Sequence, residues 1–574
     1  MPAHVPARSS STVRGRFLGF ALLAFTACST SEVSAPEQQP APASLPEHYG
    51  TLLSHVYFQD REDLQRLVSE LDVLEHVDHE KRFVAALLSW EEYSELLARG
   101  YRVEIDEEQT SLLNRQRQML QVEASSITNY PCYRTVEETY SAMAAIASSK
   151  PNLASWVDIG DSWDKVTVGG RAGYDLRVLV LTNKTITGTK PRLFLMGATH
   201  AREYVTAELA TRFAERLASE YGVNPDTTWL LDRFELHVMP HANPDGRKVA
   251  ELNYLQRKNL NNTNGGGCAY PPTSSNQDGI DLNRNHTFKW GVAAVNTSPC
   301  NQFYLGPTAG SEPEVRAVES YITSLFPDQR GPADTDAAPI DTTGVVISLH
   351  SYGKLVLYPW VHTTTAAPNA SALRSLGRKF AFFNNHQTCT WNTCLYAASG
   401  ATEDFAYGKL GVAAYTFELG SAFFESCTEF ESNILPQNLQ ALRYAFKAAR
   451  RPYRNSLGPD SVSVSVSSAS VPAGTQVRLS ATADDARYFG GNHGTEPSQN
   501  IAAARYTVNV PSWVVGTTLH AMTAADGAFS APQEAVTATL NTTGWTPGRY
   551  TLFVESQDAA GNWGAPTAVF LTIQ

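Results

Sequence analysis

Four polar residues scattered along this chain have side chains of the kinds that a catalytic zinc site uses. His200 and Glu203 stand three residues apart, and His350 and Glu418 follow much later. Two histidines and one carboxylate bind zinc and leave its fourth position to water, and a second carboxylate outside the ligand set can act as a base. These residue types therefore point to metal-assisted hydrolysis, provided that the fold brings them together.

Three of these residues come directly after apolar runs of strand length. RLFLMGAT precedes His200, VVISL precedes His350 and AAYTF precedes Glu418. The carboxyl ends of parallel strands open on one edge of an α/β sheet, where such folds bind ligands. Each residue alone has an ordinary alternative, either as a hydrogen-bonded group at a strand end or, for Glu203, as a solvated carboxylate in the first turn of a helix. Their shared position predicts one common site.

The elements around this site predict an α/β fold between about Tyr130 and Asn455. Apolar strands alternate there with amphipathic helices, which is typical of a mixed, mostly parallel sheet flanked by helices. A helix is predicted from Glu203 to Glu220, because apolar residues recur every four positions along one face. The predicted strands are 192–196, 234–239, 344–349 and 412–417, and the last helix is 436–450.

The N-terminus has the pattern of an export signal. Three arginines precede the apolar run Phe17 to Ala27, whose eleven residues are too few to cross a bilayer, and Phe25-Thr26-Ala27-Cys28 resembles a bacterial lipoprotein cleavage box. We expect residues 1–28 to be a signal peptide of a bacterial protein that is either secreted or held at the cell surface or outer membrane by a lipid on Cys28. The alternative is that Cys28 is discarded with the signal. Residues 29–47, rich in Pro, Ala, Ser and Gln, predict a linker.

Residues 48–112 predict a small α+β domain. Strands are expected at 52–58, at 101–105 and in a segment that reaches Leu88, with helices at 60–71 and after the capping box Ser89-Trp90-Glu91-Glu92. This pattern is a βαβαβ unit. The polar segment 113–127 contains Arg115 and Arg117 and predicts a linker open to proteases.

The composition and pattern of the sequence change again after Gly458. Seven short β-rich runs, separated by Gly, Pro, Asn and Asp, predict a β-sandwich over 458–574. The segment GRYTLFVESQDAAGNW at 548–563 resembles the closing strands of immunoglobulin-like or fibronectin-like modules. Such a fold implies no activity by itself.

Composition excludes several classes of protein. With 574 residues, 43% hydrophobic and 18% charged, the chain is long enough for more than one packed domain and unlike a disordered, collagenous or coiled-coil protein. Its net charge is −12 and it has no basic stripe, which argues against a nucleic-acid partner.

The cysteines predict disulfides. An even number remains once Cys28 is set aside, the predicted compartment is oxidising, and no pair has the Cys-x-x-Cys spacing of a zinc or redox motif. The sequence leaves many pairings open. Our preferred pairs are Cys389 with Cys394, Cys268 with Cys300 and, by elimination, Cys132 with Cys427.

Six blocks of sequence resemble, in the same order, those of the secreted zinc metallocarboxypeptidases of the carboxypeptidase A and B type. The blocks are GATHARE, NPDG, GIDLNRN, SLHSY, YAASG and AYTFELG. The resemblance spans roughly residues 130–455. It implies that residues 128–455 adopt the zinc carboxypeptidase-like fold, bind one Zn²⁺ and hydrolyse the C-terminal bond of peptides or proteins.

The resemblance also implies roles for the residues that match. It makes His200, Glu203 and His350 the zinc ligands. Asp281 of GIDLNRN would accept a hydrogen bond from His200 and fix its tautomer. Glu418 would be the general base that takes a proton from the attacking water and passes it to the leaving amine.

Two further groups of residues would hold the substrate. Arg257 would stabilise the oxyanion, although Lys258, or neither residue, is the alternative. Asn283, Arg284 and Tyr396 would bind the terminal carboxylate, which only a free C-terminus presents one residue from the scissile bond. A surface turn is the alternative for Asn283-Arg284, and ordinary packing for Tyr396, which stands 22 residues before the proposed base.

Two residues bear on specificity. Arg202 resembles a residue that contacts the substrate further from the cut, with a surface ion pair as its alternative. Glu403 stands where relatives that prefer basic residues carry an acidic one, and its alternative is a carboxylate that faces solvent or pairs with a neighbour. We therefore expect cleavage of C-terminal Lys or Arg, alongside hydrophobic residues.

Other interpretations remain open. The N-terminal unit resembles, in architecture and position, the activation segment of the family's zymogens, and a stable accessory domain is the alternative. A relative that trims peptidoglycan stem peptides or other non-standard amides is a second enzyme hypothesis, which Asn283-Arg284 and Tyr396 argue against. A catalytically silent surface-binding protein is a third, which the retained ligands and base argue against. The oligomeric state is not predicted.

Overall fold

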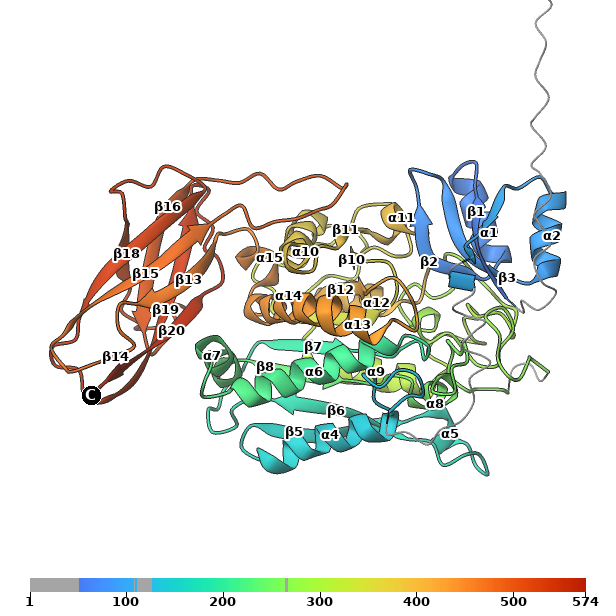
Figure 1. The fold of residues 1–574 in the computed structure, drawn as a ribbon, viewed down its shortest axis with the longest axis horizontal. Helices are drawn as coiled ribbons and strands as arrows, with labels where there is room; N and C mark the ends of the chain where they lie inside the picture. Colours follow the sequence, from blue (N-terminus) through green and yellow to red (C-terminus); the bar gives the residue numbers. More distant parts are fainter. Residues whose placement is uncertain (1–50, 108, 111–125, 264–266) are drawn as a thin grey trace, which may run out of the picture. The chain divides into compact units, whose positions relative to one another are not determined.

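The structure is a computed structural model that describes residues 51–107, 109–110, 126–263 and 267–574. Three β-sheets and the helices around them make up the described part (Figure 1). The predicted signal peptide 1–28, the linker 29–47 and nearly all of the linker 113–127 lie outside the described residues. Within the described ranges, no helix is both long and apolar enough to cross a membrane.

A mixed sheet of eight strands forms the middle of the chain, in the order β11-β10-β12-β9-β7-β8-β6-β5. Strands β12, β9, β7 and β8 run parallel, while β5, β6 and β10 are antiparallel to at least one neighbour. The predicted mixed, mostly parallel sheet is confirmed. The bounds are β5 Ala154–Asp161, β6 Asp175–Leu181, β7 Arg192–Met196, β8 Glu235–Met239, β9 Val345–His350, β10 Leu355–Tyr358, β11 Gln387–Thr390 and β12 Ala413–Glu418.

Helices pack on both faces of this sheet, which is why its central strands are apolar throughout (Figure 1). On one face lie α4 Val136–Ser149, α6 Tyr204–Glu220, α10 Ala370–Asn384 and α14 Leu435–Ala448; on the other lie α9 Pro313–Leu325 and α12 Thr402–Leu410. Helix α6 buries the face that its four-residue repeat predicts. The shorter helices are α5 Trp163–Val166, α7 Pro225–Arg233, α8 Pro244–Ala250, η1 Leu282–Arg284, α11 Trp391–Cys394, α13 Cys427–Glu429, η2 Phe430–Ile434 and α15 Pro452–Asn455.

The N-terminal sheet has four antiparallel strands in the order β2-β3-β1-β4. One prediction is wrong here, because the single strand expected to reach Leu88 is a hairpin of two. The chain reverses after Asp78, whose carboxylate accepts the Lys81 N–H, and Arg82 has a φ of +59°. The capping box at Ser89 is present. The bounds are β1 Leu52–Tyr57, α1 Arg61–Glu70, β2 Val73–Asp78, β3 Phe83–Leu88, α2 Trp90–Ala98 and β4 Val103–Ile105.

The C-terminal strands enclose a hydrophobic cluster of their own, as a β-sandwich requires. The sequence predicted seven strands and the structure has eight, because the two-residue strand β14 is too short to leave a pattern. The bounds are β13 Asp460–Val466, β14 Ser470–Val471, β15 Gln476–Asp484, β16 Ile501–Val508, β17 His520–Ala524, β18 Gln533–Asn541, β19 Gly548–Asp558 and β20 Thr567–Ile573.

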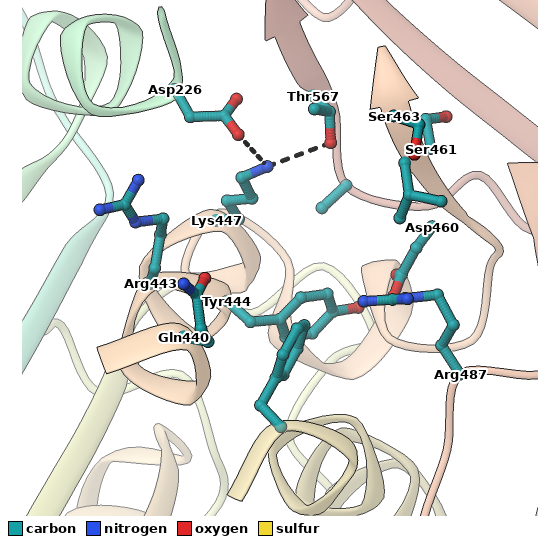
Figure 2. Close-up of a pocket in the computed structure, with 13 residues that line it drawn as sticks. Asp226, Gln440, Arg443, Tyr444, Lys447, Asp460, Ser461, Ser463, Arg487 and Thr567 are labelled. Carbon is teal, nitrogen blue, oxygen red and sulfur yellow. Dashed lines mark hydrogen bonds and ion pairs between the residues drawn. The ribbon is translucent and has the colours of Figure 1, made fainter. Parts of the chain in front are cut away.

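The three disulfides lie within the α/β region, and polar contacts join that region to the C-terminal strands. The three preferred disulfides are confirmed: Cys132–Cys427, Cys268–Cys300 and Cys389–Cys394. Near the last strands, the ammonium of Lys447 on α14 lies 2.6 Å from Asp226 and 3.1 Å from the hydroxyl of Thr567 (Figure 2). The C-terminal strands therefore pack against the helices of the α/β region.

Candidate active site

The strands of the central sheet bring the four chemical residues to one edge. His350 and Glu418 end the neighbouring parallel strands β9 and β12 and lie opposite each other in register. His200 follows β7, which pairs with β9 on its other side. Glu203 is the N-cap of α6, the helix that leaves this edge. The carboxyl ends of parallel strands thus supply the site from segments far apart in the sequence.

Three of these side chains converge on one point. His200 Nδ1 lies 2.7 Å from Glu203 Oε1 and 3.1 Å from His350 Nδ1, and His350 Nδ1 lies 3.2 Å from Glu203 Oε2. All three side chains are at most 1% exposed. Two imidazole nitrogens and a buried carboxylate that face one another are the donor set of a divalent cation, and of zinc in particular. The residues present therefore fit a zinc ion.

The other nitrogen of each imidazole is held as well. His200 Nε2 lies 3.2 Å from Asp281 Oδ1, and His350 Nε2 lies 2.9 Å from the hydroxyl of Ser348. Such contacts orient the rings and fix their tautomers. Burial and Arg257 act to lower the pKa of His200, but the carboxylates of Glu203 and Asp281 raise it overall.

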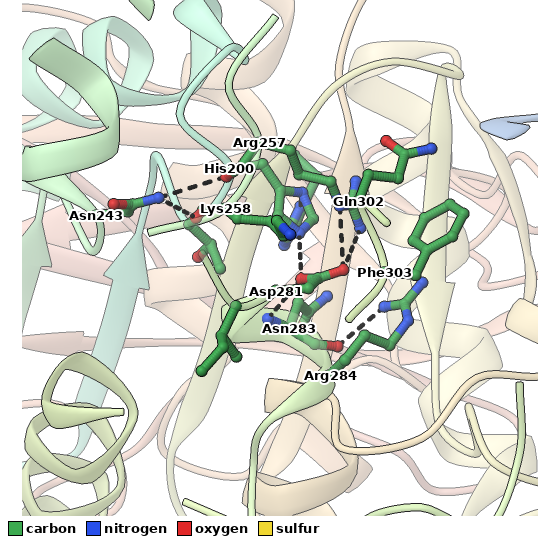
Figure 3. Close-up of polar contacts among 12 residues, drawn as sticks. His200, Asn243, Arg257, Lys258, Asp281, Asn283, Arg284, Gln302 and Phe303 are labelled. Atoms are coloured by element: carbon green, nitrogen blue, oxygen red, sulfur yellow. Dashed lines mark hydrogen bonds and ion pairs between the residues drawn. The ribbon is translucent and has the colours of Figure 1, made fainter. Parts of the chain in front are cut away.

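Asp281 also joins the site to a buried arginine. Arg257 Nε and Nη2 each lie 3.0 Å from Asp281 Oδ2, and both side chains are fully buried (Figure 3). Burial acts to raise the pKa of Asp281, yet Arg257 and His200 hold it well below its usual range. Lys258 donates instead to the carbonyls of Pro299 and Asn301, and burial lowers its pKa to about 7. Of the two candidate cations, only Arg257 contacts Asp281.

Asn283 and Arg284 lie in a buried turn, so the surface-turn alternative is wrong. The Asn283 N–H donates to Asp281 Oδ1 at 3.0 Å, and Arg284 Nη1 donates to the Asn283 carbonyl at 2.9 Å (Figure 3). The guanidinium carbons of Arg257 and Arg284 lie 5.1 and 5.4 Å from the centroid of the Phe303 ring. Two guanidinium groups thus flank one ring, which suits recognition of anionic oxygen atoms.

Tyr396, Glu403 and Arg202 are all buried near these groups. The Tyr396 ring lies 6.4 Å from that of Phe303. Glu403 is 1% exposed, so its solvent-facing alternative is wrong. Arg202 is fully buried, with Nη2 donating to Gln302 Oε1 at 2.8 Å, so its surface ion pair is wrong too.

The surroundings of Glu403 and Arg202 were not foreseen. Glu403 Oε1 accepts the Trp391 Nε1 proton at 2.7 Å and a hydrogen bond from the Thr416 hydroxyl. Thr416 stands two residues before Glu418 on β12, so their side chains share a face of the strand. The Arg202 guanidinium lies 4.0 Å from the Phe423 ring.

Sequence reasoning also missed residues that brace the site. Asn243 Nδ2 donates to the carbonyls of Thr199 and Arg257, both at 3.3 Å (Figure 3). Its place in the NPDG block was a signal that could have singled it out. Gln302 and Phe303 lie in an irregular loop whose sequence has no periodic pattern, and nothing in it marked them.

The N-terminal sheet region reaches the same loops. Gln302 Nε2 donates to the backbone carbonyl of Val73 at 3.0 Å. The neighbouring Asp72 is buried within electrostatic range of Arg202 and Arg257, and burial raises its pKa to about 7. Residues at the start of β2 therefore lie against side chains of the candidate site.

Known proteins resemble this chain in sequence and in fold. A model of the zinc carboxypeptidase family matches residues 139–441. Carboxypeptidase A2 of Rattus norvegicus is 28% identical over 347 residues, which cover 58% of this chain and 75% of the relative. Carboxypeptidase A4 of Mus musculus is 30% identical over 347 residues, with 58% and 74% covered. The crystal structure of carboxypeptidase A from Helicoverpa armigera aligns with a TM-score of 0.55 at 21% identity, over 71% of this chain and 98% of that chain.

Proposed function

Since the chain belongs to the zinc carboxypeptidase family, we infer that it is a metallocarboxypeptidase that uses one Zn²⁺ to hydrolyse the C-terminal bond of peptides and proteins. The observation that carries this function is the convergence of His200, Glu203 and His350 inside the matched segment. The roles of single residues given next are our proposals.

We propose that His200, Glu203 and His350 bind the metal. When bound, zinc supplies a Lewis acid that polarises the scissile carbonyl and activates water. Asp281 keeps a proton on Nε2 of His200, so that the Nδ1 lone pair faces the metal. Glu418, at the edge of the sheet beside His350, takes a proton from the attacking water and delivers it to the leaving amine.

The cationic side of the site would hold the substrate. We propose that Arg284, with Asn283 and Tyr396, binds the terminal carboxylate, because a guanidinium can donate hydrogen bonds to both carboxylate oxygens at once. Arg257, fixed by Asp281, stabilises the oxyanion that forms on the scissile carbonyl. Arg202, packed on Phe423, contacts the substrate further from the cut.

Paired peptides test this function. The unmodified chain is expected to release the last residue of a free-acid peptide, to spare its C-terminally amidated twin, and to stop when a chelator removes the metal. Added Zn²⁺ restores the activity. Equal cleavage of both peptides, or full activity without metal, contradicts the proposal. Faster cleavage of a peptidoglycan stem peptide would favour the amidase hypothesis, and no turnover even after trypsin has removed the N-terminal unit would favour a silent binding protein.

We further propose that Glu403 directs the enzyme toward C-terminal Lys and Arg. This carboxylate accepts hydrogen bonds from Trp391 and Thr416 at Oε1. Oε2 is buried and has no hydrogen-bond partner among the described residues. A buried carboxylate oxygen in this state favours a cationic donor, because leaving it unpaired costs free energy.

The variant Glu403→Gln separates charge from shape. It keeps an oxygen for Trp391, and it should lower kcat/KM for peptides that end in Lys or Arg by roughly tenfold or more while changing Leu and Phe endings little. Glu95→Gln, whose side chain is 70% exposed on α2, is the matched control. Basic endings that are the poorest substrates of the unmodified enzyme would overturn this specificity.

For the rest of the chain, we propose that residues 48–112 act as a pro-segment that covers the site. In this proposal, residues 113–127 form the linker that is cleaved before the catalytic domain 128–455. Residues 458–574 form an immunoglobulin-like or fibronectin-like sandwich. The hydrogen bond from Gln302 to the Val73 carbonyl and the electrostatic interaction of Asp72 with Arg202 and Arg257 support the covering role. Limited trypsin digestion near Arg117 should raise kcat/KM once the N-terminal fragment dissociates. Unchanged activity after complete cleavage would favour an accessory domain.

We also propose that residues 1–28 export the chain and that a lipid on Cys28 anchors it. The intact mass of the mature protein reads both the cleavage position and any added lipid. When the protein is partitioned between a detergent phase and an aqueous phase, Cys28→Ser should move it from the detergent phase to the aqueous phase. A mature chain that begins after Cys28 would support export of the protein and contradict its lipidation.

A further inference from the structure

A groove with a volume of about 900 Å³ opens in the C-terminal strands, outside the candidate active site. It lies between the 509–519 segment, which joins β16 to β17, and the 542–547 segment, which joins β18 to β19. Two pairs of rings line it. Tyr506 and His520 stack with centroids 4.7 Å apart, and Trp545 and Tyr550 lie 4.5 Å apart.

These rings are held in place before any ligand arrives. Tyr506 is 8% exposed and belongs to the core of the strands, while Trp545 and Tyr550 are half-buried against that core. The Trp545 backbone N–H donates to the Thr542 carbonyl, and the Tyr550 hydroxyl donates to the Thr546 carbonyl at 3.0 Å. A ligand that stacks on them would lose little free energy to side-chain ordering.

The chemistry of the lining selects an uncharged ligand. The chain has 57 acidic and 45 basic residues, yet no Lys, Arg, Asp or Glu lines this groove. A charged ligand would lose hydration there and find no opposite charge. The hydroxyls of Thr517, Thr518 and Thr539 and the amide of Asn541 lie beside the aromatic and aliphatic surface. Apolar faces edged with hydrogen-bonding groups match a sugar ring, which has apolar C–H faces and a rim of hydroxyls.

We propose that this groove binds a neutral pyranose oligosaccharide. The sugar faces pack on Trp545 and Tyr550, and the sugar hydroxyls exchange hydrogen bonds with Thr539 and Asn541. The groove then holds the peptidase on a glycan-bearing surface while its active site remains available to peptides. This binding function does not depend on the peptidase function.

Calorimetry of the full chain tests the proposal with defined probes. Cellohexaose and the hexamer of N-acetylglucosamine represent two neutral sources, and hexagalacturonate is the charged comparison. At least one neutral hexamer should bind with a Kd below about 1 mM, and hexagalacturonate should bind more weakly. The groove proposal is overturned if neither neutral hexamer binds, if the charged hexamer binds as tightly, or if an apolar peptide displaces the bound sugar.

Three variants locate the site. Trp545→Ala should weaken binding by about tenfold or more, because it removes a stacking face. Thr539→Val keeps the shape of an exposed side chain on β18, so it should fold normally and weaken binding severalfold. Trp90→Ala removes an aromatic side chain that is 51% exposed on α2 and should change nothing. Hydrolysis of a small soluble peptide should be equal in all three, and sugar binding unchanged by both groove variants would overturn the assignment.

Discussion

Asp281 is the residue on which the two halves of the candidate site meet. Its Oδ1 contacts His200 and the Asn283 N–H, and its Oδ2 contacts Arg257. One buried carboxylate therefore orients a metal ligand, a turn of the substrate pocket and a guanidinium. Its charge compensates that of the buried Arg257. The metal side and the carboxylate-binding side are thus built as one unit.

Glu418 gives the sharpest prediction for a single residue. Glu418→Gln keeps the shape of the side chain but cannot accept a proton, so kcat should fall by about 10²–10⁴-fold while KM changes little. Zinc content, measured by mass spectrometry of the metal, should stay at one ion per chain because this residue is outside the ligand set. Glu95→Gln, whose side chain is 70% exposed on α2, is the control. Activity of Glu418→Gln close to that of the unmodified chain would refute the assigned base.

Glu314 gives a prediction for stability against pH. Burial, and then the Glu312 carboxylate, raise the pKa of Glu314 from 4.5 to about 8, and Asn259 Nδ2 donates to both groups. Between these pH values the folded chain keeps a proton that the unfolded chain releases, so stability falls as pH rises from about 4.5 to 8. Glu314→Gln mimics the protonated form and removes this loss.

The gain from Glu314→Gln should therefore be small at pH 5 and reach roughly 2–4 kcal/mol at pH 8. Thermal unfolding at the two pH values measures it. An equal effect at both would mean that Glu314 is ionised in the folded chain.

At the scale of elements, the parts that the sequence predicted are those with a local signal. Helix α6 was predictable because its apolar residues recur with the helical period, and β7, β9 and β12 because they are continuous apolar runs. Because β9 and β12 end at His350 and Glu418, and His200 follows the end of β7 by four residues, these three residues could be assigned to one edge of the sheet from the sequence.

The elements that were missed have no such signal. The turn between β2 and β3 is polar but lacks the Gly or Pro that marks most turns. Phe303 and Gln302 occupy a loop without period, and the disulfide Cys268–Cys300 fixes that loop from a distance in sequence. The burial of Arg202 and Glu403 depends on tertiary contacts with Phe423 and Trp391, which no local pattern encodes.

The disulfide Cys389–Cys394 constrains the short element that carries the proposed substrate tyrosine. It closes over α11, two residues before Tyr396, and Trp391 inside the loop donates to Glu403. The double variant Cys389→Ser/Cys394→Ser should lower the free energy of unfolding by about 2 kcal/mol through the entropy of a small loop. KM should rise more than kcat falls, because Tyr396 and Glu403 would bind substrate rather than do the chemistry.

Peptide kinetics and urea unfolding of this double variant measure the two effects. The serine pair at Cys132 and Cys427, which leaves both the Tyr396 segment and the Phe303 loop constrained, serves as the comparison. If KM rose equally in both serine pairs, the Cys389–Cys394 disulfide would have no specific effect on the substrate pocket.

At the scale of the whole molecule, the C-terminal strands are part of the packing of the α/β region. Phe553 and Ala568 belong to the same hydrophobic cluster as Trp229. The Trp229 ring lies 5.9 Å from that of Phe553 and 6.1 Å from that of Trp513. These contacts distinguish the strands from a module on a flexible tether, although composition alone made them look like an independent domain.

One buried ion pair can be used to measure how far the stability of the α/β region depends on its contact with the C-terminal strands. The Lys379 side chain, on α10, is fully buried, and its ammonium lies 3.1 Å from the carboxylate of Asp460 on β13. Asp460→Asn would leave that ammonium buried without this charge and should lower the free energy of unfolding by about 3–5 kcal/mol. Lys379→Met replaces the charge with an apolar chain of similar length and should cost less.

The double variant Lys379→Met/Asp460→Asn is the decisive comparison. It should be more stable than Asp460→Asn alone. The reason is that Lys379→Met removes the buried ammonium that Asp460→Asn leaves without its carboxylate partner. Urea unfolding of the four chains, followed both by tryptophan fluorescence and by loss of peptidase activity, measures the coupling. If Asp460→Asn lost activity at the same urea concentration as the unmodified chain, the catalytic region would be stable without this contact, and the strands after Gly458 would have to be treated as a separate unit.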